Sequence, residues 1–500
     1  MKFGFKPEAF FKVLVFALFF MGASISAFAY TERNYLQKAA DFDTVKKSLV
    51  MGQRWLKLPQ YTDREGWEKI LGDSKLEFVK EGEKNLSYQW KLIKATDYLE
   101  FSRSGNRGIL EGPVAANRKA LFTLMVAELA EGRGRFIDQI INGVFLFCEM
   151  TTWSPPAHLY IQKVRSPFPD HSEDIIDISG AETAAVLAWA YYFFHAEFDK
   201  HNKLISKRLY EELERRILNN YIKDVGWWWL AENYKPGMLV NNWNPWCNSN
   251  VLLCYMLLDG DKDRFAKAVY KSMRSVDKYL NYVNEDGACD EGPGYWGVAP
   301  AQLMEYLVLL NSATGGKVDI FGNRQGRKMG EYIAYAYIGN GWSVNFADAH
   351  ANSLGGTPMK VFEYGALTGS RVMMSFSKLM ARDFPRLKNR KSGFLDFLRS
   401  LNYSKKFDSY SEEFNFPKYK WYPQTEFCHM NCGNFFLAAK GGFNNESHNH
   451  NDVGSFILYY KKNPLIIDVG VGTYTRQTFS PQRYSIWTMQ SDYHNLPKIN

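Results

Sequence analysis

Cysteine and histidine are both scarce in this chain, with six cysteines and nine histidines in 500 residues. So few cysteines do not make the dense disulfide framework of small secreted domains, and the sequence holds no redox motif. Cys428 and Cys432 are close enough to pair, which leaves either a local disulfide or two free thiols. The other four lie in apolar or helical contexts that predict burial: Cys148, Cys247, Cys254 and Cys289.

Long hydrophobic runs and dense basic blocks are also rare. Only residues 1–29 combine a basic start, an apolar middle in "VLVFALFFM" and the small-residue "SAFA" ending at Ala29, which predicts a signal peptide and a periplasmic or secreted protein. No later apolar stretch is long enough for a membrane span. The formal charge of +8 suits an anionic partner, but no Lys/Arg block indicates nucleic acid. Nothing in the sequence specifies an oligomeric state.

Aromatic residues, by contrast, are abundant: 14 Trp, 30 Tyr and 36 Phe. Many gather in segments rich in Pro, Gly or Asn, at 151–158, 226–230, 241–248 and 290–297. Aromatic faces pack against the apolar patches of sugar rings, so these segments predict a carbohydrate cleft if a scaffold places them on one rim. For the "WWW" run within 226–230, packing against the core is the favoured interpretation.

Hydrophobic periodicity divides the chain into a helical part and a strand-rich part. The chain is too long for one ordinary core, so two domains are expected. From about residue 30 to 400 apolar residues recur at helical spacing, and "AAVLAWAYYFF" (184–194) is apolar nearly all round. That pattern is typical of an inner helix in a two-layered assembly, and the recurrence of helices in pairs favours an α/α toroid.

Short β-rich runs follow after about residue 405, at 434–442, 454–462 and 464–475, with "KKNP" (461–464) as a turn. They predict a β-sandwich or a similar antiparallel structure. Too few strands precede Asn500 to close two sheets, so we expect a chain cut short at its C-terminus.

The motif "GGFNNESHNHNDVGSF" (441–456) places two of the nine histidines two positions apart. On a strand, residues i and i+2 point to the same face, so His448 and His450 are predicted to face a cleft together. Downstream, Asp468 ends an apolar strand and needs a partner, and His494 follows in "DYHNLP". Two histidines and one aspartate suit Zn²⁺, while spacing alone leaves open a structural zinc, a catalytic zinc or plain hydrogen bonds.

These motifs carry a family resemblance. "SHNHNDVGSFILYYKKNPLIIDVGVGTYT" and the later "YHN" resemble the heparinase II/III-like polysaccharide lyases, which include heparin, heparan sulfate and alginate lyases. "NNWNPW" and "EGPGYW" look like that family's other two active-site segments. The resemblance covers roughly residues 100–500. It implies an α/α toroid, an incomplete barrel of helix pairs at 30–400, followed by the start of an antiparallel β-sandwich at 401–500.

The resemblance also implies roles for particular residues. The catalytic set that it implies is Asn242, Tyr295 and His448, with Asn242 neutralising the substrate carboxylate. It further implies a zinc ion that supports the cleft, held by His450, Asp468 and His494. Pro245 stands where some members have a glutamate, so one subfamily's substrate range does not carry over. The residues that we expect to line the cleft as substrate contacts are His158, Trp243 and Trp246.

The function expected from these features is β-elimination in a polysaccharide that contains uronic acid, most simply a glycosaminoglycan such as heparin or heparan sulfate. Removing the proton on carbon 5 adds negative charge beside a carboxylate, so donors such as an Asn amide and an imidazole are needed there. A tyrosine can serve as base or as acid. Alternatives are an alginate lyase of the same family, a toroid glycoside hydrolase, a metal-dependent hydrolase and a non-catalytic polysaccharide-binding protein. The hydrolase would draw two acids from Glu182, Asp290, Glu291 and Asp348.

Overall fold

The computed structural model describes residues 32–52, 58–223, 226–388 and 394–497. The predicted signal peptide, residues 1–29, lies outside these ranges. Within them, no helix combines the length and the apolar character that crossing a membrane requires.

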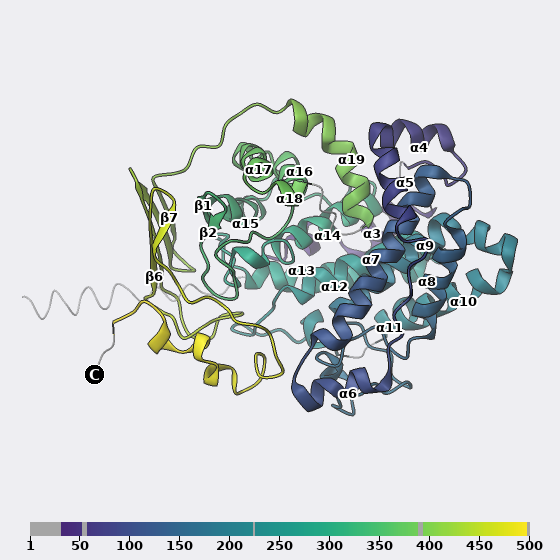
Figure 1. Ribbon diagram of the computed structural model, residues 1–500, viewed down its shortest axis with the longest axis horizontal. Coiled ribbons are helices and arrows are strands. Elements are labelled where there is room, and N and C mark those ends of the chain that lie inside the picture. The colour runs from purple at the N-terminus through teal and green to yellow at the C-terminus, as the bar shows by residue number, and fades with distance from the viewer. Residues whose placement is uncertain (1–31, 53–57, 224–225, 389–393, 498–500) are drawn as a thin grey trace, which may run out of the picture. The chain divides into compact units, whose positions relative to one another are not determined.

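The first part of the chain is helical, and Figure 1 labels most of its helices, numbered in chain order. Their bounds are α2 (Tyr35–Ala39), α3 (Phe42–Ser48), α4 (Arg64–Leu71), α5 (Lys75–Glu83), α6 (Ala95–Ser104), α7 (Gly108–Glu131), α8 (Ile137–Glu149), α9 (Ile178–His201), α10 (Lys203–Leu213), α11 (Asn219–Tyr221), α12 (Trp243–Leu258), α13 (Lys262–Tyr282), α14 (Pro300–Ala313), α15 (Arg324–Tyr335), α16 (Pro358–Thr368), α17 (Arg371–Asp383), α18 (Pro385–Lys388) and α19 (Phe394–Ser409).

The longer helices pack in two rows. In the inner row α7, α9, α12, α14 and α16 each contact the next, and in the outer row α8, α10, α13, α15 and α17 each pack against the inner helix that precedes them. The apolar segment 184–194 lies in α9, where residues on all sides of the helix are buried. Outer helices such as α13 and α15 instead have one apolar face. The prediction of an incomplete barrel of helix pairs, with 184–194 in an inner helix, is confirmed.

An antiparallel sheet follows the helices. A small hairpin, β1 (Tyr337–Gly339) and β2 (Trp342–Ser343), precedes α16, and the main sheet has the order β3-β4-β5-β6-β7. The bounds of its strands are β3 (Tyr419–Tyr422), β4 (Phe427–Cys432), β5 (Phe435–Lys440), β6 (Phe456–Tyr460) and β7 (Asn463–Ile466). Cys428 and Cys432 lie on β4 as free thiols. Among the residues described, the only other strands are those of the β1–β2 hairpin, so no second sheet closes a sandwich.

The strands match the sequence prediction in part. Strands β5 and β6 confirm the predicted runs 434–442 and 454–462, and Lys461 has the left-handed backbone of a tight turn, as "KKNP" predicts. The predicted strand 464–475 is wrong beyond Ile466. The chain leaves the sheet there because Asp468 accepts a hydrogen bond from the Gly470 N–H, which bends the backbone away from the ladder.

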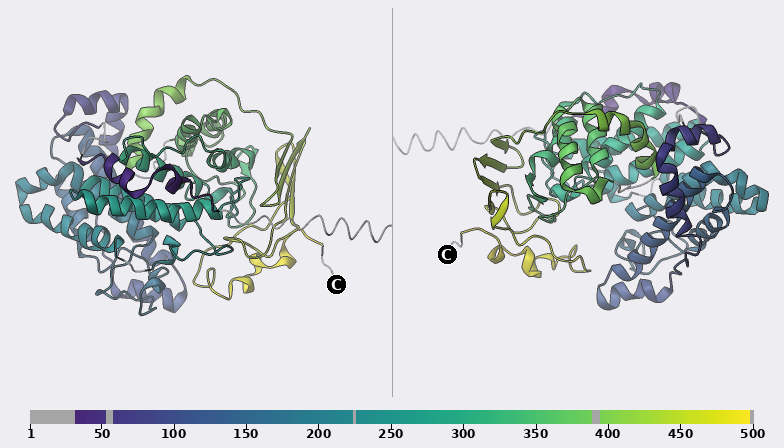
Figure 2. Two further views of the ribbon diagram at one scale, coloured as in Figure 1. Left: turned by 180° about the vertical axis from the view of Figure 1, so that it is seen from behind. Right: turned by 45° about the horizontal axis from the view of Figure 1, so that its top comes forward.

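Two hydrophobic cores meet at α14. The first is formed mainly by helices from α2 to α13, and the second joins α15–α17 to the inner face of the sheet. Leu303 and Tyr306 of α14 belong to the first core, whereas Ala301 and Met304 belong to the second. Both views of Figure 2 show the sheet standing beside the green helices of this second core. The sheet and the last helices therefore form one packed body.

A buried carboxylate fastens the β3–β4 turn to the helices. Asp286, between α13 and α14, accepts hydrogen bonds from the backbone N–H groups of Gln424 and Thr425, both at 2.8 Å, and from the Thr425 hydroxyl at 3.0 Å. Nearby, the His429 ring donates to the Tyr335 carbonyl at 3.0 Å. These bonds fix the position of the sheet and of the loops that leave it.

Replacing Asp286 by alanine should loosen this joint. The substitution leaves buried N–H donors without an acceptor, so the free energy of unfolding should fall by about 3 kcal/mol. Denaturant unfolding measures the change, with Asp408→Ala, an exposed position in α19, as the control that should leave stability unchanged. Equal stability of the two variants would contradict the role given to Asp286.

Candidate functional site

A single buried carboxylate, Asp348 in the loop after β2, collects four side chains from the C-terminal segment. Its Oδ1 accepts from His450 Nε2 at 3.0 Å and Arg483 Nη2 at 2.8 Å, and its Oδ2 accepts from His448 Nδ1 and the Tyr474 hydroxyl, both at 2.7 Å. Burial alone would raise the pKa of this acid, but hydrogen bonds from the two histidines hold the pKa well below its usual range. Asp348 is therefore an ionised anchor between the helical part and the β part.

His448 and His450 converge as predicted, but for a different reason. They lie in the loop between β5 and β6 and not on a strand, so the i, i+2 argument is wrong. His448 has a left-handed backbone, φ 56°, and its carbonyl accepts from Arg483 Nη2 at 3.1 Å. That conformation costs a non-glycine residue about 1–2 kcal/mol. The bonds of Asp348 and Arg483, not strand alternation, aim the two rings.

Glu291 connects His448 to the N-terminus of α12. Its Oε2 lies 3.4 Å from His448 Nε2, and its Oε1 accepts from the backbone N–H of Asn242 at 3.2 Å. Burial raises the pKa of Glu291 to about 7. Burial lowers the pKa of His448, but Glu291 and Asp348 together raise it above its ordinary value. The Asn242 amide group hydrogen-bonds none of the residues that the structure describes, so its donors are available to a ligand.

Tyr295 completes the set. It ends the short helical turn Pro293–Tyr295, and its ring centroid lies 4.2 Å from that of His448. Its hydroxyl is 2.6 Å from that of Tyr474. Since Tyr474 donates its proton to Asp348, Tyr295 is the donor to Tyr474. Burial raises the pKa of Tyr295 above its ordinary value, which favours the protonated phenol. Tyr295 and His448, far apart in sequence, thus adjoin each other, and Asn242 is linked to them through Glu291.

The predicted substrate contacts differ in what they face. Trp246 and His158 line a cavity of about 240 Å³, and Trp246 also lines an adjoining cavity of about 600 Å³ that reaches Gly294 beside Tyr295. Trp243 is 9% exposed and packs against His158 and Trp228, with ring centroids 4.6 and 5.1 Å apart. Its contacts indicate packing more than sugar binding.

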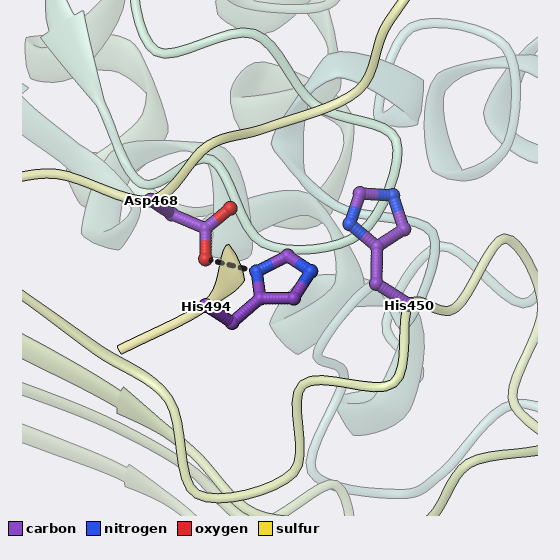
Figure 3. A group of neighbouring side chains, drawn as sticks. All are labelled: His450, Asp468 and His494. Carbon is purple, nitrogen blue, oxygen red and sulfur yellow. Dashed lines mark hydrogen bonds and ion pairs between the residues drawn. The ribbon is translucent and has the colours of Figure 1, made fainter. Parts of the chain in front are cut away.

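The predicted metal ligands His450, Asp468 and His494 lie together, each with a ligand atom within 4.8 Å of the others. Figure 3 shows His494 bonded to Asp468, through Nδ1 and Oδ2 at 2.7 Å, with the His450 ring opposite. His450 Nδ1 and His494 Nε2 are buried and bond no described residue. The unused imidazole nitrogens and the Asp468 carboxylate are ligands that suit Zn²⁺, and Asp348 holds the second nitrogen of His450, as is usual for metal-binding histidines.

Sequence reasoning missed the anchor. The sequence offers Asp348 and Glu291 only as two of the four acids available to a hydrolase, and it indicates no role for Arg483. The signal was available for Asp348, because it stands between alanines and near Phe346 in "NFADAH", as Asp468 stands in "LIIDVG". A carboxylate in an apolar stretch requires partners. No pattern in the sequence identifies those partners, which lie about 100 residues or more away.

Comparison with known proteins gives one match to a family model and a group of distant structural matches. Residues 417–495 match the model described as Heparinase II/III-like, C-terminal. No curated protein sequence matches the chain.

The similar solved structures include a heparinase III, 14% identical, covering 94% of this chain and 63% of that one, with a TM-score of 0.49. A heparan sulfate lyase from Pedobacter heparinus is 13% identical, with 90% and 63% coverage and a TM-score of 0.44. A variant of the chondroitin AC lyase from Streptomyces coelicolor is 12% identical, with 84% and 57% coverage and a TM-score of 0.46. This chain spans less than two thirds of the length of each.

We propose that His450, Asp468 and His494 bind one zinc ion that ties the C-terminal loops together, and His450→Ala tests this. The variant should lose its zinc, unfold several degrees lower and lose activity together, because the loop that holds His448 is released. Metal analysis, thermal unfolding with and without chelator, and activity measure these effects. Chelator should destabilise the parent protein and the exposed-site control His201→Ala, but not His450→Ala. A folded, zinc-replete and active His450→Ala would contradict the assignment.

Proposed function

We propose that the protein is a polysaccharide lyase, starting from the match of residues 417–495 to the heparinase II/III-like C-terminal model. Its substrate is a polysaccharide that contains uronic acid, with a glycosaminoglycan such as heparin or heparan sulfate as the first candidate. The product is an unsaturated oligosaccharide formed by β-elimination. The observation that supports this most is the contact of the protonated Tyr295 with the carboxylate-bound ring of His448, whose partner Glu291 also bonds the backbone of Asn242.

The carboxylate of the uronic acid is the group that these residues must manage. Its negative charge makes the neighbouring proton on carbon 5 a weak acid, because removing that proton adds charge to the same group. Donors already in place at the carboxylate reduce this cost. The Asn242 amide provides such donors at the N-terminus of α12, next to Glu291.

His448 is the base in this proposal. Its Nδ1–H donates to Asp348, so Nε2 is the nitrogen that exchanges a proton. Glu291, with a pKa of about 7, accepts the Nε2 proton and leaves the imidazole neutral. Nε2 then takes the proton from carbon 5. The electron pair of the broken C–H bond forms the double bond between carbons 4 and 5.

Tyr295 is the acid. As the bond between carbon 4 and the glycosidic oxygen breaks, the phenol donates its proton to that oxygen. Its raised pKa keeps the proton on the phenol until the oxygen becomes basic. A uronic acid of the other configuration at carbon 5 presents its proton to the opposite face, where Tyr295 would first have to be a phenolate. The protonated phenol therefore favours substrates for which His448 is the base.

The hydrolase alternative has less support from the geometry. It needs a carboxylic acid and a carboxylate that are both free to meet substrate and water. Asp348 has both oxygens bonded, and Glu182 pairs with Arg118 at 3.0 Å. Asp290 accepts the Tyr282 hydroxyl at 2.8 Å. A metal-dependent hydrolase needs a zinc ion with an open coordination site for the substrate. The zinc proposed here instead ties the C-terminal loops together.

A panel of polysaccharides tests the function directly. Heparin, heparan sulfate, chondroitin sulfate, hyaluronan and alginate are incubated with the protein, and ultraviolet absorbance reports the conjugated double bond. Absorbance should rise with at least one of them. Cleavage that yields reducing ends without absorbance would identify a hydrolase, and binding with no product in long incubations would identify a binding protein.

Tyr295→Phe tests the acid. The variant keeps the ring but lacks the proton donor, so kcat should fall by about 10²–10⁴-fold while KM changes little. Tyr419→Phe, on an exposed part of β3, is the matched control and should keep the parent rate. If Tyr295→Phe turns over at the parent rate, Tyr295 has no part in the chemistry.

A further inference from the structure

Arg107, just before α7, carries an unused edge of its guanidinium in the smaller cavity. Its Nε donates to Glu111 Oε1 at 2.8 Å, and its Nη2 donates to His158 Nε2 at 3.1 Å. Its Nη1 hydrogen-bonds none of the residues in the described ranges. Arg107 lines the cavity of about 240 Å³ together with Trp246 and His158. One face of a fixed cation is therefore available to whatever enters.

His158 acts on Arg107 and has no donor left for a ligand. Its Nδ1 bonds the buried carboxylate of Asp177, which also accepts from the Ser154 hydroxyl at 2.6 Å and the Gly180 N–H at 2.7 Å. Because the Nδ1–H of His158 donates its hydrogen bond to Asp177, Nε2 carries no proton and accepts from Arg107. Both ring nitrogens are occupied. The sequence-based expectation that His158 contacts substrate directly is replaced by a positioning role.

The cavity adjoins a larger one that is lined by Gly294, the chain neighbour of Tyr295. It shares Arg118, Glu182 and Trp246 with that larger cavity. Asn106, the residue before Arg107, forms a β-bridge with Thr475. The backbone N–H of Arg476 also donates to the Gly105 carbonyl at 3.2 Å. Arg107 and Tyr474 are thus the chain neighbours of the two bridged residues, Asn106 and Thr475.

We propose that Arg107 binds an anionic group, a carboxylate or a sulfate, on the sugar next to the one that is cleaved, and that His158 and Asp177 position it. This rests on the proposed lyase function. Guanidinium groups form strong charge-assisted hydrogen bonds with both anions. The nearby pairs Arg107–Glu111 and Arg118–Glu182 leave the cavity lining nearly balanced in charge, so it suits one anionic group and not a dense cluster.

Calorimetric binding to uronic-acid oligosaccharides tests the proposal in a Tyr295→Phe background, in which substrate is not consumed. The oligosaccharides are used in matched sulfated and unsulfated forms. Arg107→Gln should weaken binding by about tenfold or more, because a charge-assisted hydrogen bond is lost. Arg103→Gln, exposed near the end of α6, is the control and should bind as the background does. Weakening with both forms identifies a carboxylate as the bound group, and weakening with the sulfated form alone identifies a sulfate.

His158 variants test the positioning role. His158→Ala should weaken binding, whereas His158→Gln should restore most of it, because the amide can accept from Arg107 and donate to Asp177. In the catalytically intact protein, Arg107→Gln should raise KM several-fold and leave kcat within about threefold. A purely structural defect would not be restored by glutamine or confined to KM.

The outcomes separate this inference from the function on which it rests. If no polymer gives an absorbing product but oligosaccharide binding still depends on Arg107, the lyase function fails and the binding role of Arg107 survives. If Arg107→Gln binds every oligosaccharide as tightly as the background, or if the background binds none, the assignment of Arg107 is overturned. Failure of glutamine to restore binding at His158 overturns the positioning role.

Discussion

The buried carboxylate of Asp348 is the constraint on which the site depends. It comes from the helical half, and each of its partners, His448, His450, Tyr474 and Arg483, comes from the C-terminal segment. An ionised group of this kind is stable inside a protein only when it is fully hydrogen-bonded. The same hydrogen bonds that satisfy the charge therefore also orient the imidazole of His448 and the hydroxyl of Tyr474, to which Tyr295 is bonded. Burying the charge of Asp348 therefore requires these side chains to be in place around it.

The same device recurs at each histidine given a function. Asp348 and Glu291 flank His448, Asp468 bonds His494, and Asp177 bonds His158. In each case a buried acid selects which ring nitrogen carries the proton, and so leaves the other nitrogen for a task. The roles that we propose are proton transfer for the ring of His448, metal binding for that of His494 and support of a cation for that of His158.

Local patterns in the sequence predicted what depends on local physics. The apolar segment 184–194 became the inner helix α9, and the runs around β5 and β6 became strands, since periodicity reports burial directly. The histidine motif and the tyrosine of "GPGY" were identified through the family resemblance. The loop conformation of His448 could not be read from the sequence, because it is imposed by Asp348, 100 residues away. The relay from Asp177 through His158 to Arg107 was hidden for the same reason.

The two hydrophobic cores have a consequence for how the site is completed. Asn242 and Arg107 are carried by helices of the first core, whereas Tyr295 packs on the second, and α14 has side chains in both. Because α14 contributes side chains to both cores, its straightness sets the spacing of Asn242 and Arg107 from Tyr295, and a bend there would change that spacing without unfolding either core.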